Sequence, residues 1–114
     1  MAELKFVPAL PLSALPTGQM RACTVDGREL LLCRTREGLH VVDNICTHAF
    51  ARLVEGRLRG TKLQCPLHGA VFDVRDGRVL KGPATEPLPA HHWRIVDDQV
   101  EVALDPAAAP RMSG

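Results

Sequence analysis

The sequence has few aromatic residues and no long apolar run. It contains no tyrosine, one tryptophan and three phenylalanines among 114 residues. No segment approaches the ~18 consecutive apolar residues of a membrane-spanning helix. The N-terminus also lacks a basic leader followed by an apolar stretch and a small-residue cleavage site. We therefore expect a cytoplasmic protein that does not enter a membrane.

An excess of charge of either sign is also missing. Fourteen lysine and arginine residues nearly balance thirteen aspartate and glutamate residues, which gives a formal net charge of +1. Proteins that bind nucleic acid or anionic membranes usually present a strong basic field, so neither is an expected partner. The length suffices for one small domain, whose modest core would gain stability from a metal site or another cross-link.

The spacing of turn-forming residues along the chain is typical of an all-β domain. Short runs rich in valine, leucine and isoleucine alternate with glycine, proline and Asp-Gly about every eight to twelve residues. One helical turn is expected within residues 10–18, and Asp26-Gly27 predicts a two-residue hairpin turn. The expected strands cover residues 5–7, 21–25, 29–34, 39–44, 57–59, 62–64, 71–74, 78–80, 93–96 and 100–104.

The C-terminal segment differs in composition from the rest. Residues 105–114 are rich in alanine and proline and offer little to bury, so we expect a flexible tail there. The folded domain is then expected to comprise residues 3–104.

Two stretches break the β pattern, and each contains one cysteine and one histidine. The first reads Cys46-x-His48, and after sixteen residues the second reads Cys65-x-x-His68. At these short spacings, a thiolate and an imidazole from one loop can converge on one centre. Turns of this kind also point backbone N–H groups inward, where they can donate to sulfur. The four side chains are therefore candidate metal ligands.

This double motif resembles the signature of the Rieske proteins, in which Cys-x-His and Cys-x-x-His are separated by a spacer of similar length. The resemblance continues through residues 42–44, 68–73, Gly77 and 82–84. It implies the Rieske fold, an antiparallel β-sandwich with a small cluster-binding subdomain of two ligand loops. It also implies a [2Fe–2S] cluster, with Cys46 and Cys65 on the inner iron and His48 and His68 on the outer, solvent-facing iron.

The resemblance also leads to an expectation for the redox potential. High-potential Rieske proteins carry an extra disulfide between the ligand loops, and serine and tyrosine hydroxyls that donate to cluster sulfur. The matching positions here are Ala51, Leu67, Ala70 and Phe72. Because each missing donor removes stabilisation of the reduced state, we expect a midpoint potential in the lower half of the Rieske range of about −150 to +300 mV.

A small, low-potential Rieske domain is similar to the ferredoxin component of bacterial oxygenases that hydroxylate aromatic rings. The similarity implies a monomeric electron carrier rather than an enzyme. It would take single electrons from a flavin-containing, NADH-dependent reductase and pass them to a terminal oxygenase, through contacts near His48 and His68. Apart from the candidate metal ligands, the sequence contains no Ser/His/Asp pattern typical of a catalytic triad, and no glycine-rich loop indicates a nucleotide site.

Three alternatives remain open from the sequence. One is the small Rieske-like subunit of an assimilatory nitrite reductase. A second is the Rieske subunit of a periplasmic oxidase, which the absent twin-arginine leader and the missing disulfide pair disfavour. The third is a closed zinc site in a binding module, although structural zinc sites usually pair cysteine with cysteine and histidine with histidine.

The two other cysteines flank the Asp26-Gly27 turn. A hairpin centred there places Cys23 opposite Leu30 and Cys33 opposite Met20. The two Cα atoms would then lie ~10 Å apart, beyond the reach of a disulfide. We expect two buried, unpaired thiols.

The remaining residues of interest fall into groups. Apolar side chains expected to cover the cluster, or to form a docking patch around it, are Phe50, Leu67 and Pro83. A basic stretch that is either a solvated face or steers an acidic partner contains Arg52, Arg57, Arg59 and Lys62. The histidines expected at the surface or in turns are His40, His91 and His92. Loop scaffold and exposed strand ends are both open interpretations for Asp43 and Asp73.

Overall fold

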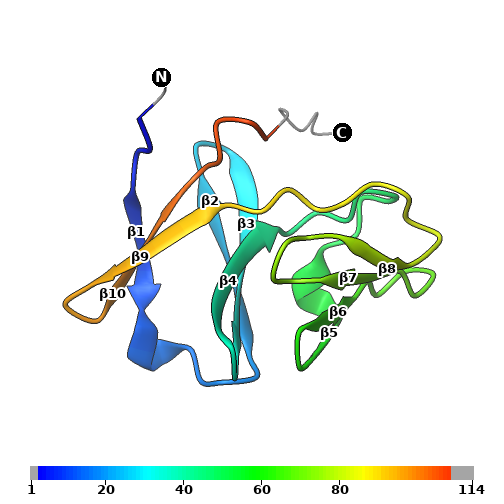
Figure 1. Ribbon diagram of the computed structural model, residues 1–114, viewed down its shortest axis with the longest axis horizontal. Coiled ribbons are helices and arrows are strands. Elements are labelled where there is room, and N and C mark those ends of the chain that lie inside the picture. The colour runs from blue at the N-terminus through cyan, green and yellow to red at the C-terminus, as the bar shows by residue number, and fades with distance from the viewer. Residues whose placement is uncertain (1–2, 109–114) are drawn as a thin grey trace.

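Three antiparallel sheets make up the part of the chain that the computed structural model describes, residues 3–108 (Figure 1). Their strand orders are β1-β10-β9, β2-β3-β4 and β5-β6-β7-β8. The strands are β1 (Val7–Pro11), β2 (Met20–Val25), β3 (Arg28–Thr35), β4 (Gly38–Asp43), β5 (Arg57–Arg59), β6 (Lys62–Gln64), β7 (Val71–Asp73), β8 (Val79–Lys81), β9 (His92–Val96) and β10 (Gln99–Ala103). Two short 3₁₀ helices are η1 (Leu12–Ala14) and η2 (Leu53–Glu55). The all-β antiparallel fold expected from the sequence is confirmed.

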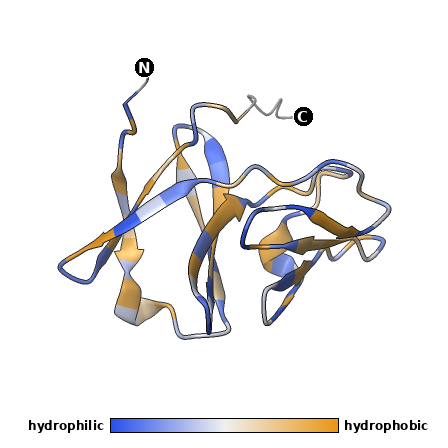
Figure 2. Cartoon of the chain, in the orientation of Figure 1, coloured by the Kyte–Doolittle hydropathy of each residue, from blue (hydrophilic) through white to orange (hydrophobic). Residues whose placement is uncertain are grey.

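The middle sheet is buried on both faces, because its central strand β3 carries four consecutive buried apolar residues. Leu30 and Leu32 point into a core shared with β1 and β10, whereas Leu31 and Cys33 point into a second core shared with β5–β8. A continuous apolar run is the pattern of a strand covered on both sides. Figure 2 shows hydrophobic colouring along much of the strands, with β9 mostly blue and white, and hydrophilic colouring at most hairpin turns.

Two hairpins turn through two consecutive residues with positive φ. Asp26 and Gly27 have φ of 50° and 80°, which confirms the expected two-residue turn between β2 and β3. Asp97 and Asp98, with φ of 50° and 67°, join β9 to β10 in the same way. Aspartate tolerates this conformation better than most residues, so both hairpins can close without added loop length.

The register of the first hairpin also decides the question of Cys23 and Cys33. Cys23 pairs with Leu30 and Cys33 with Met20, as expected. Cys33 is buried in one core, and partly buried Cys23 packs against the other, so the two thiols lie on opposite faces of the sheet. Neither Cys23 nor Cys33 forms a disulfide, as expected, although Cys23 is only partly buried and not fully buried.

The expected first strand was wrong in position. Residues 5–7 were expected, but β1 runs over Val7–Pro11 and includes two prolines. A proline cannot donate to a ladder, so a strand containing it is tolerated at a sheet edge or a bulge. Strand β1 is such an edge, and its register shifts between Pro8 and Leu10. Most other strands lie within a residue or two of their expected positions, and η1 occupies the expected helical turn.

The described end of the chain continues past the last strand. The amide of Asp105 donates to His91 Nδ1 at 3.0 Å, and the amide of Ala108 donates to the Asp105 carbonyl at 3.0 Å. The rest of the expected tail, residues 109–114, lies outside the described residues, so the boundary at residue 104 stays a prediction. Among residues 3–108, no helix is long and apolar enough to cross a membrane.

Candidate metal centre

The first ligand loop, residues 46–51, closes like a hairpin. An isolated antiparallel bridge between Ile45 and Arg52 flanks it, and the amide of Cys46 donates to the carbonyl of Ala51 at 2.9 Å. Behind the loop, the side-chain oxygen of buried Asn44 accepts a hydrogen bond from the amide of Val54 in η2 at 2.9 Å. The cysteine is therefore fixed at the base of the loop, where the chain leaves β4.

The second ligand loop, residues 65–70, repeats this arrangement. Gln64 of β6 pairs with Val71 of β7, and the amide of Cys65 donates to the carbonyl of Ala70 at 2.8 Å. Its histidine comes one residue later in the loop than in the first, and His68 adopts a φ of 63°. This left-handed conformation is uncommon for a residue other than glycine. Two loops of equal length therefore hold the expected ligands opposite one another. In the sequence, this similarity between the loops is visible only as two Cys/His pairs.

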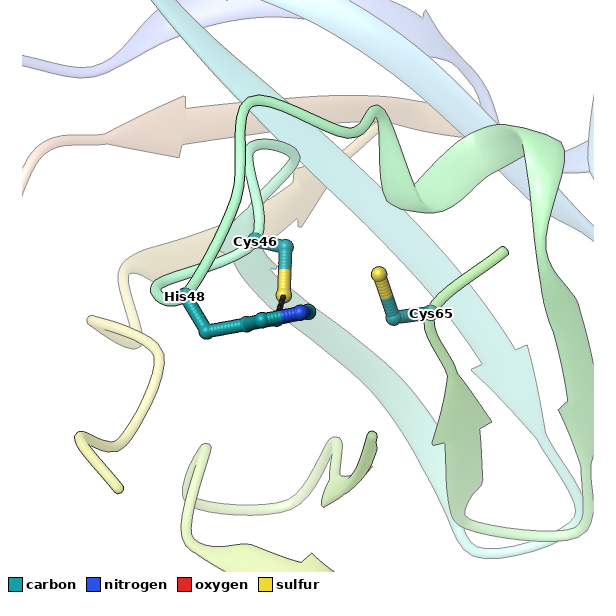
Figure 3. A group of neighbouring side chains, drawn as sticks. All are labelled: Cys46, His48 and Cys65. Carbon is teal, nitrogen blue, oxygen red and sulfur yellow. Dashed lines mark hydrogen bonds between the residues drawn. The ribbon is translucent and has the colours of Figure 1, made fainter. Parts of the chain in front are cut away.

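Three of the four expected ligands form one group between these loops, and the fourth, His68, contacts His48 of that group. One donor atom each from Cys46, His48 and Cys65 lie within 4.8 Å of one another (Figure 3). His48 Nδ1 lies 3.0 Å from Cys46 Sγ, and His48 Nε2 lies 3.1 Å from Nδ1 of His68. The two imidazole rings meet edge to face, with centroids 5.4 Å apart. The loops therefore bring Cys46, His48 and Cys65 into one group and place His68 against His48 at its edge.

Burial divides the four side chains into an inner and an outer pair. Cys46 and Cys65 are 1% and 2% exposed, whereas His48 is half-buried and His68 is exposed. Burial raises the pKa of the Cys65 thiol, the backbone amide of Leu67 lowers it, and the neighbouring Cys46 raises it further. Two soft sulfur donors beside two imidazoles suit an iron–sulfur cluster or zinc, and a metal would deprotonate both thiols. The residues present therefore fit a [2Fe–2S] group with two sulfur and two nitrogen ligands.

Small and apolar side chains pack around the two thiols. Ala51, Ala70, Phe72 and Ala84 are buried in the same core as the cysteines. The three apolar side chains that were expected either to cover the site or to form a docking patch around it lie at the surface, with Phe50 76% and Leu67 48% exposed and Pro83 exposed as well. The thiols are thus kept dry by this core, and the larger apolar groups remain accessible beside the histidines.

A buried polar network anchors the strand that leads into the first loop. Asp43 is 1% exposed and accepts two hydrogen bonds from Arg28 at 2.8 Å and one from His91 Nε2 at 2.8 Å. Because the amide of Asp105 donates to Nδ1, His91 donates its Nε2 proton to Asp43. Burial alone would raise the pKa of Asp43, but hydrogen bonds from His91 and Arg28 outweigh it and lower the pKa. Asp43 is therefore part of the scaffold, not an exposed strand end.

The placement of His91 at the surface or in a turn was wrong. Its side chain is fully buried, and its partner Asp43 lies 48 residues away in sequence, so no local signal could reveal the pair. His40 is partly buried and bonds Thr35 Oγ1 at 3.1 Å. His92 is exposed, as expected.

Asp73 plays the corresponding role behind the second loop. It is 2% exposed and is held by the amide and guanidinium of Arg75 and, at 3.5 Å, by Arg78. The side-chain hydrogen bond from Arg75 lowers the pKa of Asp73 to about 2.

One member of the expected basic stretch has an acidic partner. Arg52 forms an ion pair with Glu29 at 3.0 Å. Arg52 is therefore a paired residue.

Comparison with known proteins agrees with this geometry. The family profile described as Rieske [2Fe–2S] domain matches residues 5–103. The ferredoxin component of a naphthalene 1,2-dioxygenase system from Pseudomonas aeruginosa is 36% identical over 100 residues, covering 88% of this chain and 96% of the relative. With the family match, the cofactor is a [2Fe–2S] cluster, and the zinc alternative falls away.

Solved structures show the same relationship. The ferredoxin of carbazole 1,9a-dioxygenase from Nocardioides aromaticivorans superposes with a TM-score of 0.83 at 30% identity, covering 88% of this chain and 98% of that one. A chain from a complex of reduced oxygenase and oxidised ferredoxin in carbazole 1,9a-dioxygenase gives a TM-score of 0.82 at 29% identity, covering 86% of this chain and 92% of that one.

A more distant structure is a nitrite reductase small subunit from Mycobacterium tuberculosis. Its TM-score is 0.79 at 22% identity, with 90% of this chain and 96% of that chain covered, a likeness that shows the fold alone. Profile, relative and structures agree, and the chain belongs to the Rieske [2Fe–2S] family, among its ferredoxins, which carry electrons and are not enzymes.

Proposed function

We propose that this protein carries single electrons from a flavin-containing, NADH-dependent reductase to the Rieske centre of a terminal aromatic-ring dioxygenase. In this proposal the cluster is held by Cys46 and Cys65 on the inner iron and by His48 and His68 on the outer iron. The observation that carries it is the division of these four side chains into a buried thiol pair and an accessible imidazole pair.

This division suits electron transfer to another protein. When bound, the cluster supplies reversible one-electron chemistry. The chain keeps the thiols out of water in an apolar core and turns His68 to the surface. Exposed Phe50 and Leu67 beside the histidines offer apolar area for a brief contact. A partner that docks on this tip comes close to the cluster without any rearrangement of the loops.

The names of the relatives support the choice of partners. The Pseudomonas relative is a ferredoxin component of a dioxygenase system, and one structural neighbour comes from a complex of oxygenase and ferredoxin. The reductase follows from the one-electron role, and NADH as its donor would place the protein in the cytoplasm. We further propose that the carrier is a monomer, because it must bind two partners in turn through one tip.

The nitrite reductase alternative has weaker support. It rests on a likeness of fold at 22% identity, whereas the dioxygenase ferredoxins match at 36% identity over nearly their whole length. A small subunit of that kind would stay bound to its large subunit. The ferredoxin hypothesis instead requires that the cluster can be reduced when the protein is purified without a partner.

The test begins with the protein purified alone. We expect iron and sulfide in equal amounts, and an electron paramagnetic resonance (EPR) spectrum of the reduced protein with the low average g of a cluster with two histidine ligands. His68→Ala should abolish this spectrum, whereas His92→Ala, the matched change at an exposed histidine outside the loops, should retain it. A colourless zinc protein, or an unchanged spectrum in His68→Ala, would refute the ligand assignment.

The second part of the test addresses the partners. The reductase and oxygenase of a naphthalene 1,2-dioxygenase system can be combined with this protein in place of their own ferredoxin. We expect NADH-dependent reduction of the cluster, followed by its reoxidation when oxygenase and naphthalene are added. A loaded cluster that the reductase does not reduce would count against the proposed partners.

A further inference from the structure

Charge is divided unevenly between the parts of this nearly neutral chain. Residues 57–81 contain six lysines and arginines but only two aspartates, a formal charge of +4. The whole chain carries +1, so the remainder carries −3. The segment with the excess of positive charge is the one that folds into β5–β8 and carries the second ligand loop.

The strand register collects the cations on one face of the sheet β5–β8. Leu58 and Leu63 pair across β5 and β6 and turn toward the core. Arg57 and Arg59 flank Leu58, and Lys62 lies directly opposite Arg59. Because side chains alternate along a strand, these three exposed cations share the outer face. We call this surface, together with exposed Lys81 on β8, the basic face.

The four cations of the basic face have no partner of their own. Within residues 3–108, none of them forms an ion pair or a side-chain hydrogen bond. The nearby acid Asp73 is buried and already bound to Arg75 and Arg78. The positive charge of this face is therefore available to another molecule.

The basic face adjoins the cluster tip, by which we mean the end of the molecule formed by the two ligand loops, residues 46–51 and 65–70. Arg57 pairs with Gln64, which directly precedes Cys65, and Lys81 directly precedes the 82–84 loop. Lys62 is three residues from Cys65, or about 10 Å along an extended strand. A partner that touches exposed His68 is thus close enough to meet these charges, because the distance is comparable to the Debye length of about 8–10 Å at 0.15–0.1 M ionic strength.

We infer that the basic face is a docking surface for an acidic patch on a redox partner, and that it orients the cluster tip toward that partner. The inference rests on the proposed function and adds the sign of the partner's surface. Opposite charges across such a contact raise the rate of productive encounter more than they raise affinity. An acidic protein surface is favoured over a nucleic acid or an anionic membrane because the chain as a whole has almost no net charge.

The test replaces the partner by a surface of defined charge. The probe is a gold electrode coated with a carboxylate-terminated monolayer, compared with an amine-terminated one, and the measurement is the rate of electron exchange with the loaded protein. We expect at least about a tenfold faster rate on carboxylate. This advantage should shrink as ionic strength rises from about 0.01 M to about 0.15 M.

Charge-reversal variants locate the effect. Arg57→Glu with Lys62→Glu should remove the preference for carboxylate, and Arg57→Gln with Lys62→Gln should reduce it. The matched control, Lys5→Glu with Arg21→Glu, reverses two exposed charges outside β5–β8 and should keep the preference. The EPR spectrum and the potential measured with a dissolved mediator should be the same in all of these proteins.

Two results would overturn the inference: equal rates on both monolayers, or loss of the preference in the control pair as well. Absence of the EPR spectrum from the unaltered protein would overturn the proposed function instead. The two failures are therefore distinguishable.

Discussion

The body of the protein, β1–β4 with β9 and β10, and the cluster sheet, β5–β8 with the two ligand loops, are built differently. Strands of the body have five to eight residues, whereas every strand of the cluster sheet has three. The core between β3 and β10 is aliphatic, with fully buried Leu30, Leu32 and Val100. The core beneath the cluster sheet contains Cys46 and Cys65. The body is stabilised by burial of its apolar side chains, whereas the cluster sheet also depends on the cluster that its two cysteines bind.

The two cores lie on opposite faces of the middle sheet, and its central strand β3 contributes buried side chains to both. Leu31 and Cys33 of β3 face the cluster sheet, and Leu30 and Leu32 face the body core. A strand fixed by packing on one side presents a rigid base on the other. The ligand loops can then stay in place although their own strands are short.

The largest expected effect comes from removing one inner thiol. Cys46→Ala should prevent cluster binding, because a three-ligand site leaves one iron incomplete. Amide hydrogen exchange in residues 45–52 and 64–71 should become at least about tenfold faster, while amides of β3 and β10 keep their protection. Mass spectrometry of exchanged peptides measures both regions at once.

The matched control is Cys23→Ala, which removes a thiol that packs against the body core. It should leave the iron content and the loop protection unchanged. If the body of Cys46→Ala exchanged as fast as its loops, the two regions would form one cooperative unit and the comparison would fail.

A second, smaller effect distinguishes the two faces of β3. Leu31→Ala and Leu32→Ala each remove a fully buried side chain and should each lower the free energy of unfolding by about 2–5 kcal/mol. Only Leu31 lies in the core that contains the cysteines, so only Leu31→Ala should change the EPR spectrum. Denaturant unfolding and EPR of both variants check this. A changed spectrum in Leu32→Ala would contradict the independence of the two cores.

The sequence predicted those parts of the fold that depend on local chemistry. Asp26-Gly27 sets a two-residue turn, the turn sets the register, and the register places Cys23 opposite Leu30. The first strand was misplaced because Pro8 and Pro11 argue against a strand locally. What permits them is an edge position, which is a property of the assembled sheet.

The same limit applies to the candidate site. The ligand pattern was readable because each cysteine has its histidine two or three residues away. The support beneath it was not, because His91 meets Asp43 across 48 residues. Likewise, only the pairing of Arg52 with Glu29 shows that it does not belong with the free cations of β5 and β6. Contacts between residues far apart in the sequence therefore determine the roles of these side chains, which the local sequence pattern leaves open.

Acid should weaken the cluster sheet through Asp73. Hydrogen bonds from Arg75 hold the pKa of this buried carboxyl at about 2, below its ordinary value of 3.8. A lowered folded pKa contributes stability that is complete above about pH 4 and is lost as the pH falls toward 2. Asp73→Asn should therefore destabilise the protein at pH 6, by an amount that narrows as the pH approaches 3.

The free energy of unfolding of both proteins, measured from pH 6 to pH 3, tests this expectation. Asp97→Asn is the control, because this exposed carboxylate in a turn of the body forms no ion pair within residues 3–108. A gap between Asp73→Asn and the unaltered protein that stays constant with pH would show that the carboxylate's charge contributes nothing there.

The smallest expected effect is a shift of redox potential that belongs to the cluster sheet alone. Ala70 is fully buried, and its carbonyl binds the Cys65 amide. Ala70→Ser adds a hydroxyl beside this ligand, and a neutral hydrogen bond has a net value of about 0.5–1.5 kcal/mol. If the bond favours the reduced cluster, the one-electron midpoint potential should rise by about 20–60 mV. Ala103→Ser adds the same hydroxyl at a fully buried alanine of β10 and should leave the potential unchanged in the same voltammetric measurement. Equal shifts of the midpoint potential in both variants would mean that a change in protein stability, rather than a hydrogen-bond donor at the cluster, causes the shift. A rise confined to Ala70→Ser would show that the residue at this position tunes the low potential that the missing hydroxyls predict.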